Sequence, residues 1–344
     1  MALPAKASTL LVIFGAGASF DSVAEPPEYA DRDWRPPLAR QLFENRRSFG
    51  EVMQRFPDAL PAIAEVRSAV RSGAPVEATL QALRDRASGY PPLERSLAAV
   101  RFYLQEVIWR SGNIWREGAH GLTNYVELAA RIEEWRYLND ARVMYVTFNY
   151  DLLLESACTH LSFGKVADYV ANEYTKVFKL HGSVNWGREI DDSTNFVAAD
   201  HRASIAHQVG ELKISNRFQI LSQWDRPVRK LRRLFPAIAL PTQTKSLYEC
   251  PEDHLAVLRN LLPTVTQCLI VGWRAQEQNF VEMLSKTLSG TTRMHVVAGS
   301  EAGASAVRRT LIEAGVAGRP TGHSHGFSGY VAAPQHLRGL VRTR

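Results

Sequence analysis

The chain of 344 residues contains 45% hydrophobic and 22% charged residues and has a formal charge of +6, values typical of a soluble globular protein. No uninterrupted apolar stretch approaches the roughly 20 residues of a membrane-spanning helix. The three cysteines, Cys158, Cys250 and Cys268, are too few and too far apart for a disulfide framework or a paired-cysteine zinc site. We therefore expect a cytoplasmic protein with no membrane segment.

The first expected element is a buried strand that ends in a glycine-rich turn. In "LLVIFGAGASF", residues 10–20, five apolar residues without alternation are typical of a strand buried on both faces. Gly15 and Gly17 then allow a sharp turn that exposes backbone N–H groups, as in folds that bind a pyrophosphate. The pattern meets only half of the dinucleotide fingerprint, so a plain strand and turn without a ligand stays open. The apolar run is too short for a secretory signal.

Residues 21–142 are expected to form a mainly helical insertion. Its beginning is rich in Pro and charge, and helical patterns follow from about residue 60. In "LERSLAAVRFYLQEVIW", Leu97, Val100 and Leu104 recur at helical spacing. A further helix is predicted after a cap at Thr123 or Asn124.

Strands and helices alternate along the rest of the chain. Expected strands are "RVMYVTFNY" from Val143, "YTKVFKLHGSVNW", "FPAIALPT", "CLIVGW" and "RMHVVAGS", and helices are expected near Asp151, after Arg274 and from Glu301. Such alternation implies crossover connections and a parallel sheet. The sequence therefore predicts an α/β protein with a Rossmann-like doubly wound parallel sheet and a helical insertion or small subdomain.

We expect one domain, with its core in residues 8–20, 143–186 and 236–320. Residues 187–235 are predicted to be an irregular basic insertion, and residues 321–344 a C-terminal tail. The basic segment 226–233 suits a solvated or subunit-contacting helix, and a nucleic-acid contact through the phosphates is the alternative. Because no recognition helix or base-stacking pattern accompanies it, we do not expect direct nucleic-acid binding.

Polar residues and glycines follow several of the predicted strands. In a doubly wound sheet, ligands bind at the carboxyl ends of the strands. Each residue also has a plain structural interpretation: His181 as a core histidine, Asn149 and Asp151 as helix caps, and Gly272 as a turn residue. Their order, each after a separate strand, favours a common site.

Four motifs in this order, "FGAGAS", "TFNYD", "KLHGS" and "LIVGW", resemble the sirtuin family, and most closely its bacterial antiphage branch, whose members consume NAD. An "RPPL" element at residues 35–38 is similar to one in that branch. The chain lacks the four-cysteine zinc module and the Gly-Ile-Pro-Asp-Phe-Arg element of the deacylases, which favours NAD cleavage over deacylation. Where many relatives carry an Asp after "LIVGW", this chain has Gln276 and Glu277.

The resemblance implies a role for each matching residue. Asn149 would position the attacking water beside the nicotinamide ribose, and His181 would be the general base or a ribose hydroxyl partner. Asp151 would contact the nicotinamide carboxamide or hold its loop. The remaining predicted NAD-binding residues are Gly15, Ala16, Gly17, Ala18 and Ser19 at the pyrophosphate, together with Gly182, Gly272 and Ser300.

The resemblance thus implies an NAD⁺ glycohydrolase that uses NAD⁺ as its substrate, needs no metal and defends bacteria against phage by NAD depletion. Since unrestrained NAD loss would kill the host, we expect gating by homo-oligomerisation or by a partner, for example a helicase-type ATPase or an Argonaute-like protein. Two alternatives stay open: a module that binds NAD or ADP-ribose as a signal without turnover, and a protein ADP-ribosyl or acyl transferase.

Overall fold

The computed structural model describes residues 8–22, 36–118, 121–191, 201–221, 234–242 and 248–341. These residues form two compact units. The first unit falls within residues 1–25, 116–180 and 252–344, and the second within residues 26–115 and 181–251. Among the described residues, none of the helices combines the length and the apolar character that crossing a membrane requires.

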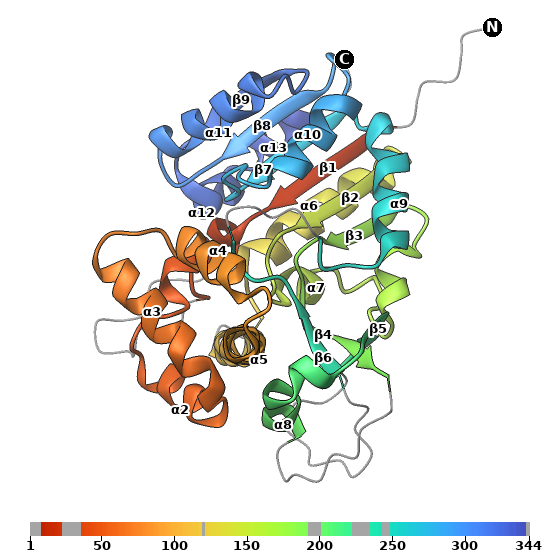
Figure 1. The fold of residues 1–344 in the computed structure, drawn as a ribbon. Coiled ribbons are helices and arrows are strands. Elements are labelled where there is room, and N and C mark those ends of the chain that lie inside the picture. The colour runs from red at the N-terminus through yellow and green to blue at the C-terminus, as the bar shows by residue number, and fades with distance from the viewer. Residues whose placement is uncertain are drawn as a thin grey trace, which may run out of the picture. The chain divides into compact units, whose positions relative to one another are not determined.

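The first unit is built on a six-stranded parallel sheet (Figure 1). Its strands are β1 (Thr9–Phe14), β2 (Arg142–Thr147), β3 (Thr175–Lys179), β7 (Gln267–Val271), β8 (Arg293–Val297) and β9 (Arg319–His323). They lie in the order β3-β2-β1-β7-β8-β9, and every neighbouring pair is parallel. Counted along the chain this is the 3-2-1-4-5-6 order of the Rossmann fold, which confirms the predicted doubly wound sheet.

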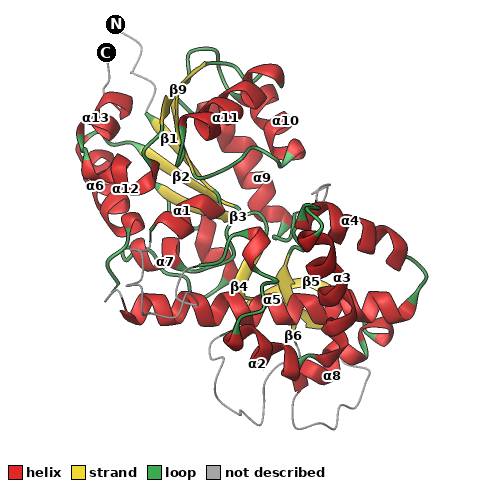
Figure 2. Ribbon diagram, turned by 90° about the vertical axis from the view of Figure 1, so that its left-hand side faces the viewer, coloured by secondary structure: helices red, strands yellow, loops and turns green. Residues whose placement is uncertain are grey.

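Helices cover both faces of this sheet, with α6, α12 and α13 on one side and α9, α10 and α11 on the other (Figure 2). All residues of β1 and β7 are buried, as expected for central parallel strands. The helices of the unit are α1 (Ala16–Asp21), α6 (Asn124–Leu138), α7 (Leu153–Ala157), α9 (Glu252–Leu261), α10 (Gln278–Thr287), α11 (Glu301–Glu313), α12 (Gly326–Ala332) and α13 (Gln335–Val341). Thr123 is the cap of α6, its hydroxyl accepting a hydrogen bond from Val126 N.

The second unit combines helices with a small antiparallel sheet. Its helices are α2 (Arg47–Arg55), α3 (Leu60–Arg71), α4 (Val76–Ala87), the greater part of α5 (Pro91–Gly118) and α8 (His201–His207). In the sheet, β4 (Gly182–Ile190) lies between β5 (Ile214–Ile220) and β6 (Leu234–Ile238). The predicted helical insertion is therefore mostly in this unit.

Two segments expected in the parallel core belong to the antiparallel sheet instead. Residues 182–186 lie in β4, and residues 234–238 form β6, which pairs with β4. A short apolar run does not specify its partner strand, so its direction could not be predicted. Residues 187–235 are also more regular than expected, since α8 and β5 occupy the described part. The basic segment 226–233 and Arg35 of the "RPPL" element lie outside the described residues.

Residues 321–341, the described part of the expected tail, belong to the first unit. Its beginning completes β9, which pairs with β8, and α12 and α13 follow. Because β9 is the edge strand of the sheet, it has one neighbour only and its sequence "RPTGH" carries no apolar run. The usual strand pattern is therefore missing from this segment.

Candidate functional site

The turns that follow β1 and β7 meet where the strand order of the sheet reverses. Gly15 N donates to Val271 O at 3.1 Å, and Gly17 N donates to Gly272 O at 3.1 Å. In an open α/β sheet this switch point, beyond the carboxyl ends of the strands, is where ligands bind. The glycine-rich motif and "LIVGW" thus form one corner of the first unit.

Glycine is required in these turns because the two backbones touch. Gly272 has a φ of +62°, and a Cβ at this position would overlap Ala18 N. A Cβ at Gly15 would come 2.6 Å from the Trp273 Cα. Close approach of two backbone segments explains both glycines without reference to a ligand.

Most amides predicted to hold a pyrophosphate donate within the protein. Besides Gly15 N and Gly17 N, Ala18 N donates to Gly15 O at 2.9 Å. Within the described part of the chain, no residue accepts a hydrogen bond from Ala16 N. The predicted pyrophosphate contact therefore stays a prediction. The backbone N–H of Ala16 is the one in this turn that could donate to a pyrophosphate without losing a bond to a described residue.

The Asn149 side chain reaches the same corner from the end of β2. Its Nδ2 atom lies 2.9 Å from Gly15 O, 2.9 Å from Ser19 Oγ and 3.0 Å from Tyr125 Oη. Asn149 is 6% exposed. All three side-chain bonds to described residues use Nδ2, which leaves Oδ1 as the remaining polar atom of the amide.

Ser19 and Asp151 continue this network. Ser19 Oγ donates to Asp151 Oδ2 at 2.7 Å and lies 3.0 Å from Tyr125 Oη. Asp151 Oδ1 accepts from Leu153 N at 3.0 Å, a bond that holds the turn into α7. Asp151 thus combines the predicted capping function with a link to the glycine-rich turn.

The only hydrogen of the Ser19 hydroxyl goes to Asp151. A phosphate offers acceptors alone, so a phosphate contact of Ser19 would require this bond to break. The pyrophosphate role of Ser19 stays a prediction, and the observed contacts tie Ser19 to Asn149 and Asp151.

Tyr125 enters the network as a neutral phenol. Burial, and then the charge of Asp151, raise its pKa well above the ordinary value, although the hydrogen bonds to Ser19 and Asn149 oppose this. Its ring packs against Phe14 at 4.8 Å and against Phe327 at 5.5 Å between centroids. The phenol can therefore both accept and donate a hydrogen bond here.

A fully buried lysine, Lys179, is hydrogen-bonded to the loop that contains Asp151. Lys179 Nζ donates to the backbone oxygen of Asp151 and to Glu155 Oε1, the latter at 2.8 Å. Tyr169 Oη also donates to Glu155 Oε1, at 3.0 Å. A buried ion pair that is additionally hydrogen-bonded fixes the position of the loop, because breaking it would leave a charge without compensation.

Comparison with solved structures finds Sir2 homologues. A Sir2 homologue in complex with NAD is 12% identical over 98% of this chain and 91% of that chain, with a TM-score of 0.44. An ADP-ribose complex of a mutant Sir2 homologue is 13% identical over 99% of this chain and 96% of that chain, with a TM-score of 0.45. No family model and no curated protein matches the chain. Because these identities and TM-scores are low, we assign the fold class from the strand order of the parallel sheet.

Three of the remaining predicted site residues have structural roles of their own. His181 and Gly182 belong to the second unit, where His181 O accepts from Ala239 N at 2.9 Å. Gly182 has a φ of +81°, and a Cβ there would overlap Ala237 O. Ser300 is the cap of α11, accepting a hydrogen bond from Gly303 N at 3.2 Å. Their ligand contacts stay predictions.

Directly after Gly272, the aromatic ring of Trp273 packs against another aromatic side chain. Trp273 stacks on Phe148 at 5.5 Å and 9°. Its Nε1 donates to Glu277 Oε2 at 2.5 Å, and Glu277 is buried. Glu277 therefore holds the indole ring of Trp273 in place.

Tyr125, Lys179 and Glu155 are residues of the network that the sequence motifs did not predict. Tyr125 lies in the first turn of α6 and carries no local signal, since its partners are distant in sequence. Lys179 had a usable signal: a charged residue within the apolar stretch "KVFKL" must find a partner when the strand is buried.

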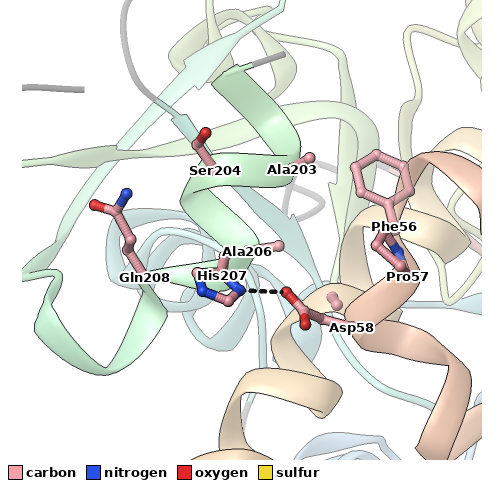
Figure 3. Close-up of a pocket in the computed structure, with 9 residues that line it drawn as sticks. Phe56, Pro57, Asp58, Ala203, Ser204, Ala206, His207 and Gln208 are labelled. Carbon is pink, nitrogen blue, oxygen red and sulfur yellow. Dashed lines mark hydrogen bonds and ion pairs between the residues drawn. The ribbon is translucent and has the colours of Figure 1, made fainter. Parts of the chain in front are cut away.

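A separate pocket of about 270 Å³ lies in the second unit (Figure 3). Apolar side chains, among them Phe56 and Pro57, line it, and a His207–Asp58 pair at 2.9 Å lies beside them. It contains none of the predicted site residues. Among the described residues, no group of three or more His, Cys, Asp or Glu could hold a metal ion.

Proposed function

We propose that the protein is an NAD⁺ glycohydrolase that releases nicotinamide and ADP-ribose. The observation that carries the proposal is the buried network at the switch point, which holds the Asn149 amide by Nδ2 and leaves Oδ1 for a ligand. The motif order shared with NAD-consuming sirtuin relatives supports the choice of substrate.

The proposed chemistry needs few protein groups. Nicotinamide leaves as a neutral molecule from a cationic precursor, so no strong acid is needed, and the ribose becomes oxocarbenium-like. Nearby oxygen atoms stabilise that charge. In the proposal Asn149 Oδ1 positions the attacking water, and an imidazole nitrogen of His181 accepts its proton.

The other roles involve residues of the first unit, except for Gly182, which belongs to the second. Asp151 holds the loop that carries Asn149, and in the proposal it borders the nicotinamide carboxamide. The Ala16 amide faces the pyrophosphate, while Gly272, Ser300 and Gly182 line the ligand. We further propose a cytoplasmic antiphage effector that acts by NAD depletion, gated by homo-oligomerisation or by a helicase-type ATPase or Argonaute-like partner.

The test is to incubate purified protein with NAD⁺, with and without candidate partners, and to quantify nicotinamide and ADP-ribose. Asn149→Ala and His181→Ala should each lower release by about 10²-fold or more. Asn139→Ala and His207→Ala are matched controls, since both residues are exposed and outside the proposed site, and they should retain activity.

Other outcomes would replace the proposal. Tight NAD⁺ binding without release under any condition would indicate a signalling module. Product that forms only with an added protein acceptor would indicate a transferase. Full activity of Asn149→Ala would remove the assigned site.

A further inference from the structure

The orientation of the Asn149 side-chain amide, that is, which side its nitrogen occupies, follows from the hydrogen-bond acceptors around it. Gly15 O is a carbonyl oxygen and can only accept, so the amide atom 2.9 Å from it must be the nitrogen. This argument does not depend on how the nitrogen and oxygen of the side chain were assigned.

The direction of the other bonds follows from the Asp151 carboxylate. Asp151 accepts the single hydrogen of Ser19, so Ser19 Oγ can only accept from its other neighbours. Tyr125 must therefore donate its own hydrogen to Ser19, at 3.0 Å. The Tyr125 oxygen is then left to accept from Asn149 Nδ2, at 3.0 Å.

We infer that Tyr125 is a positioning residue: its phenol acts through Asn149 and Ser19 and keeps the Asn149 oxygen turned toward the ligand. The inference rests on the proposed function in so far as Asn149 acts on the substrate. Tyr125 comes from α6, outside the motifs that carry the family resemblance.

Counting hydrogens predicts how strongly each substitution acts. The Asn149 amide has two hydrogens and three acceptors: Gly15 O, Ser19 Oγ and Tyr125 Oη. Removing the phenol oxygen alone leaves two acceptors and weakens the hold on the amide. Removing the oxygens of both Tyr125 and Ser19 leaves one acceptor and an unpaired buried N–H, which is costly.

The first test compares NAD⁺ cleavage by Tyr125→Phe with that of the wild type. The phenyl ring retains its packing against Phe14 and Phe327, so only the hydroxyl is lost. We expect kcat to fall about 3- to 10-fold with KM for NAD⁺ unchanged. The double variant Tyr125→Phe/Ser19→Ala should lose more than the product of the single losses.

Tyr145→Phe is the matched control. Tyr145 is another buried tyrosine packed on Phe14, at 6.2 Å, but it lies in β2 and no hydrogen bond joins it to Asn149. It should retain the wild-type kcat. Equal kcat values for Tyr125→Phe and Tyr145→Phe would overturn the inference.

A second measurement separates this inference from the proposed function. In a double-mutant cycle by chemical unfolding, Tyr125→Phe should cost less stability in the Asn149→Ala background than in the wild type. If the wild type cleaves no NAD⁺, the proposed function fails. The coupling energy between Tyr125 and Asn149 still tests whether the two side chains interact. Absence of coupling would overturn the positioning role whatever the activity.

Discussion

The side-chain amide of Asn149 is held in one orientation by the hydrogen-bond acceptors around it. Gly15 O, Ser19 Oγ and Tyr125 Oη all accept hydrogen bonds from its Nδ2 atom. The Asp151 carboxylate accepts the hydrogen of Ser19 and thereby sets which atoms donate and which accept in the other bonds. Isosteric replacements that change donors into acceptors are therefore informative at this position.

Asn149→Asp should be less stable than Asn149→Ala, although it has nearly the shape of the wild type. One carboxylate oxygen would face Gly15 O where Nδ2 now lies 2.9 Å away, and a second charge would be buried near Asp151. The new carboxyl group would have a raised pKa, so its deficit relative to wild type should grow as the pH rises.

Thermal unfolding of wild type, Asn149→Ala and Asn149→Asp at about pH 5 and about pH 8 checks this expectation. A deficit of Asn149→Asp that is the same at both pH values would contradict the raised pKa, and an Asn149→Asp protein as stable as Asn149→Ala would contradict the assigned orientation of the amide.

Gly272 is the other residue whose identity is dictated by its surroundings. Gly272→Ala should lower the free energy of unfolding by about 3 kcal/mol, because the positive φ of +62° disfavours a side chain and the Cβ would overlap Ala18 N. Urea unfolding measures the loss. Gly290→Ala is the control, as no atom lies within 4 Å of its Cβ position and its φ is not positive, and it should stay within about 0.5 kcal/mol of wild type. A neutral Gly272→Ala would show that the two turns can separate at little cost.

At the scale of elements, α1, α6 and α12 are joined at one point. Asp21, at the end of α1, accepts from Phe327 N and from Ser328 N, the latter at 3.0 Å, and thereby holds the first turn of α12. Asn124, at the start of α6, donates to Asp21 O and to Ser328 Oγ, each at 2.8 Å. The helix that carries Tyr125 is thus tied to the C-terminal helices.

Histidines cluster where these C-terminal helices meet β8 and β9. The His323 ring lies 6.5 Å from His295, 5.4 Å from His325 and 4.7 Å from His336, measured between centroids. Burial, and then His323 and His336, lower the pKa of His295 to about 4. The pKa of His323 is also lowered, by burial first and then by His336 and His325.

Acid should therefore destabilise the packing of α12 and α13. A histidine whose pKa is lowered in the folded state contributes stability above its ordinary pKa, about 6.5, and this stability is lost as the pH falls toward the folded value. For His295 that window extends down to about 4. We expect the unfolding midpoint to fall across it, and His295→Gln to reduce the slope.

Amide hydrogen exchange separates this effect from that of another histidine. Burial lowers the pKa of His254, in α9, to about 4, which adds a loss of the same sign. On acidification the protection factors, which are exchange rates corrected for the intrinsic effect of pH, should fall in α12 and α13 of the wild type and fall less in His295→Gln. An identical response in both proteins would assign the acid sensitivity to other groups.

At the scale of the whole molecule, the proposed catalytic residues belong to both units, Asn149 to the first and His181 to the second. The chain passes from one unit to the other between Leu180 and His181, within the "KLHGS" motif. The "KLHGS" motif is thus divided between a strand of the parallel sheet and a strand of the antiparallel sheet.

Much of the parallel sheet could be predicted because its central strands are continuous apolar runs. Leu10–Phe14, Val143–Thr147 and Cys268–Val271 are buried on both faces and need little context to be recognised. The edge strand β9 was not predicted. β4 and β6 were expected as strands, but their place in a separate antiparallel sheet was not, because edge position and strand partner depend on contacts with distant segments.

The sequence by itself determined the fold class and the order of motifs around a glycine-rich turn, since both follow from local patterns of burial and backbone freedom. Only the tertiary structure decided which groups meet there. Asn149 bonds to Gly15, Ser19 and Tyr125 across separations of 134, 130 and 24 residues. The direction of those bonds depends on the balance of donors and acceptors in one buried place, and no local pattern records that balance.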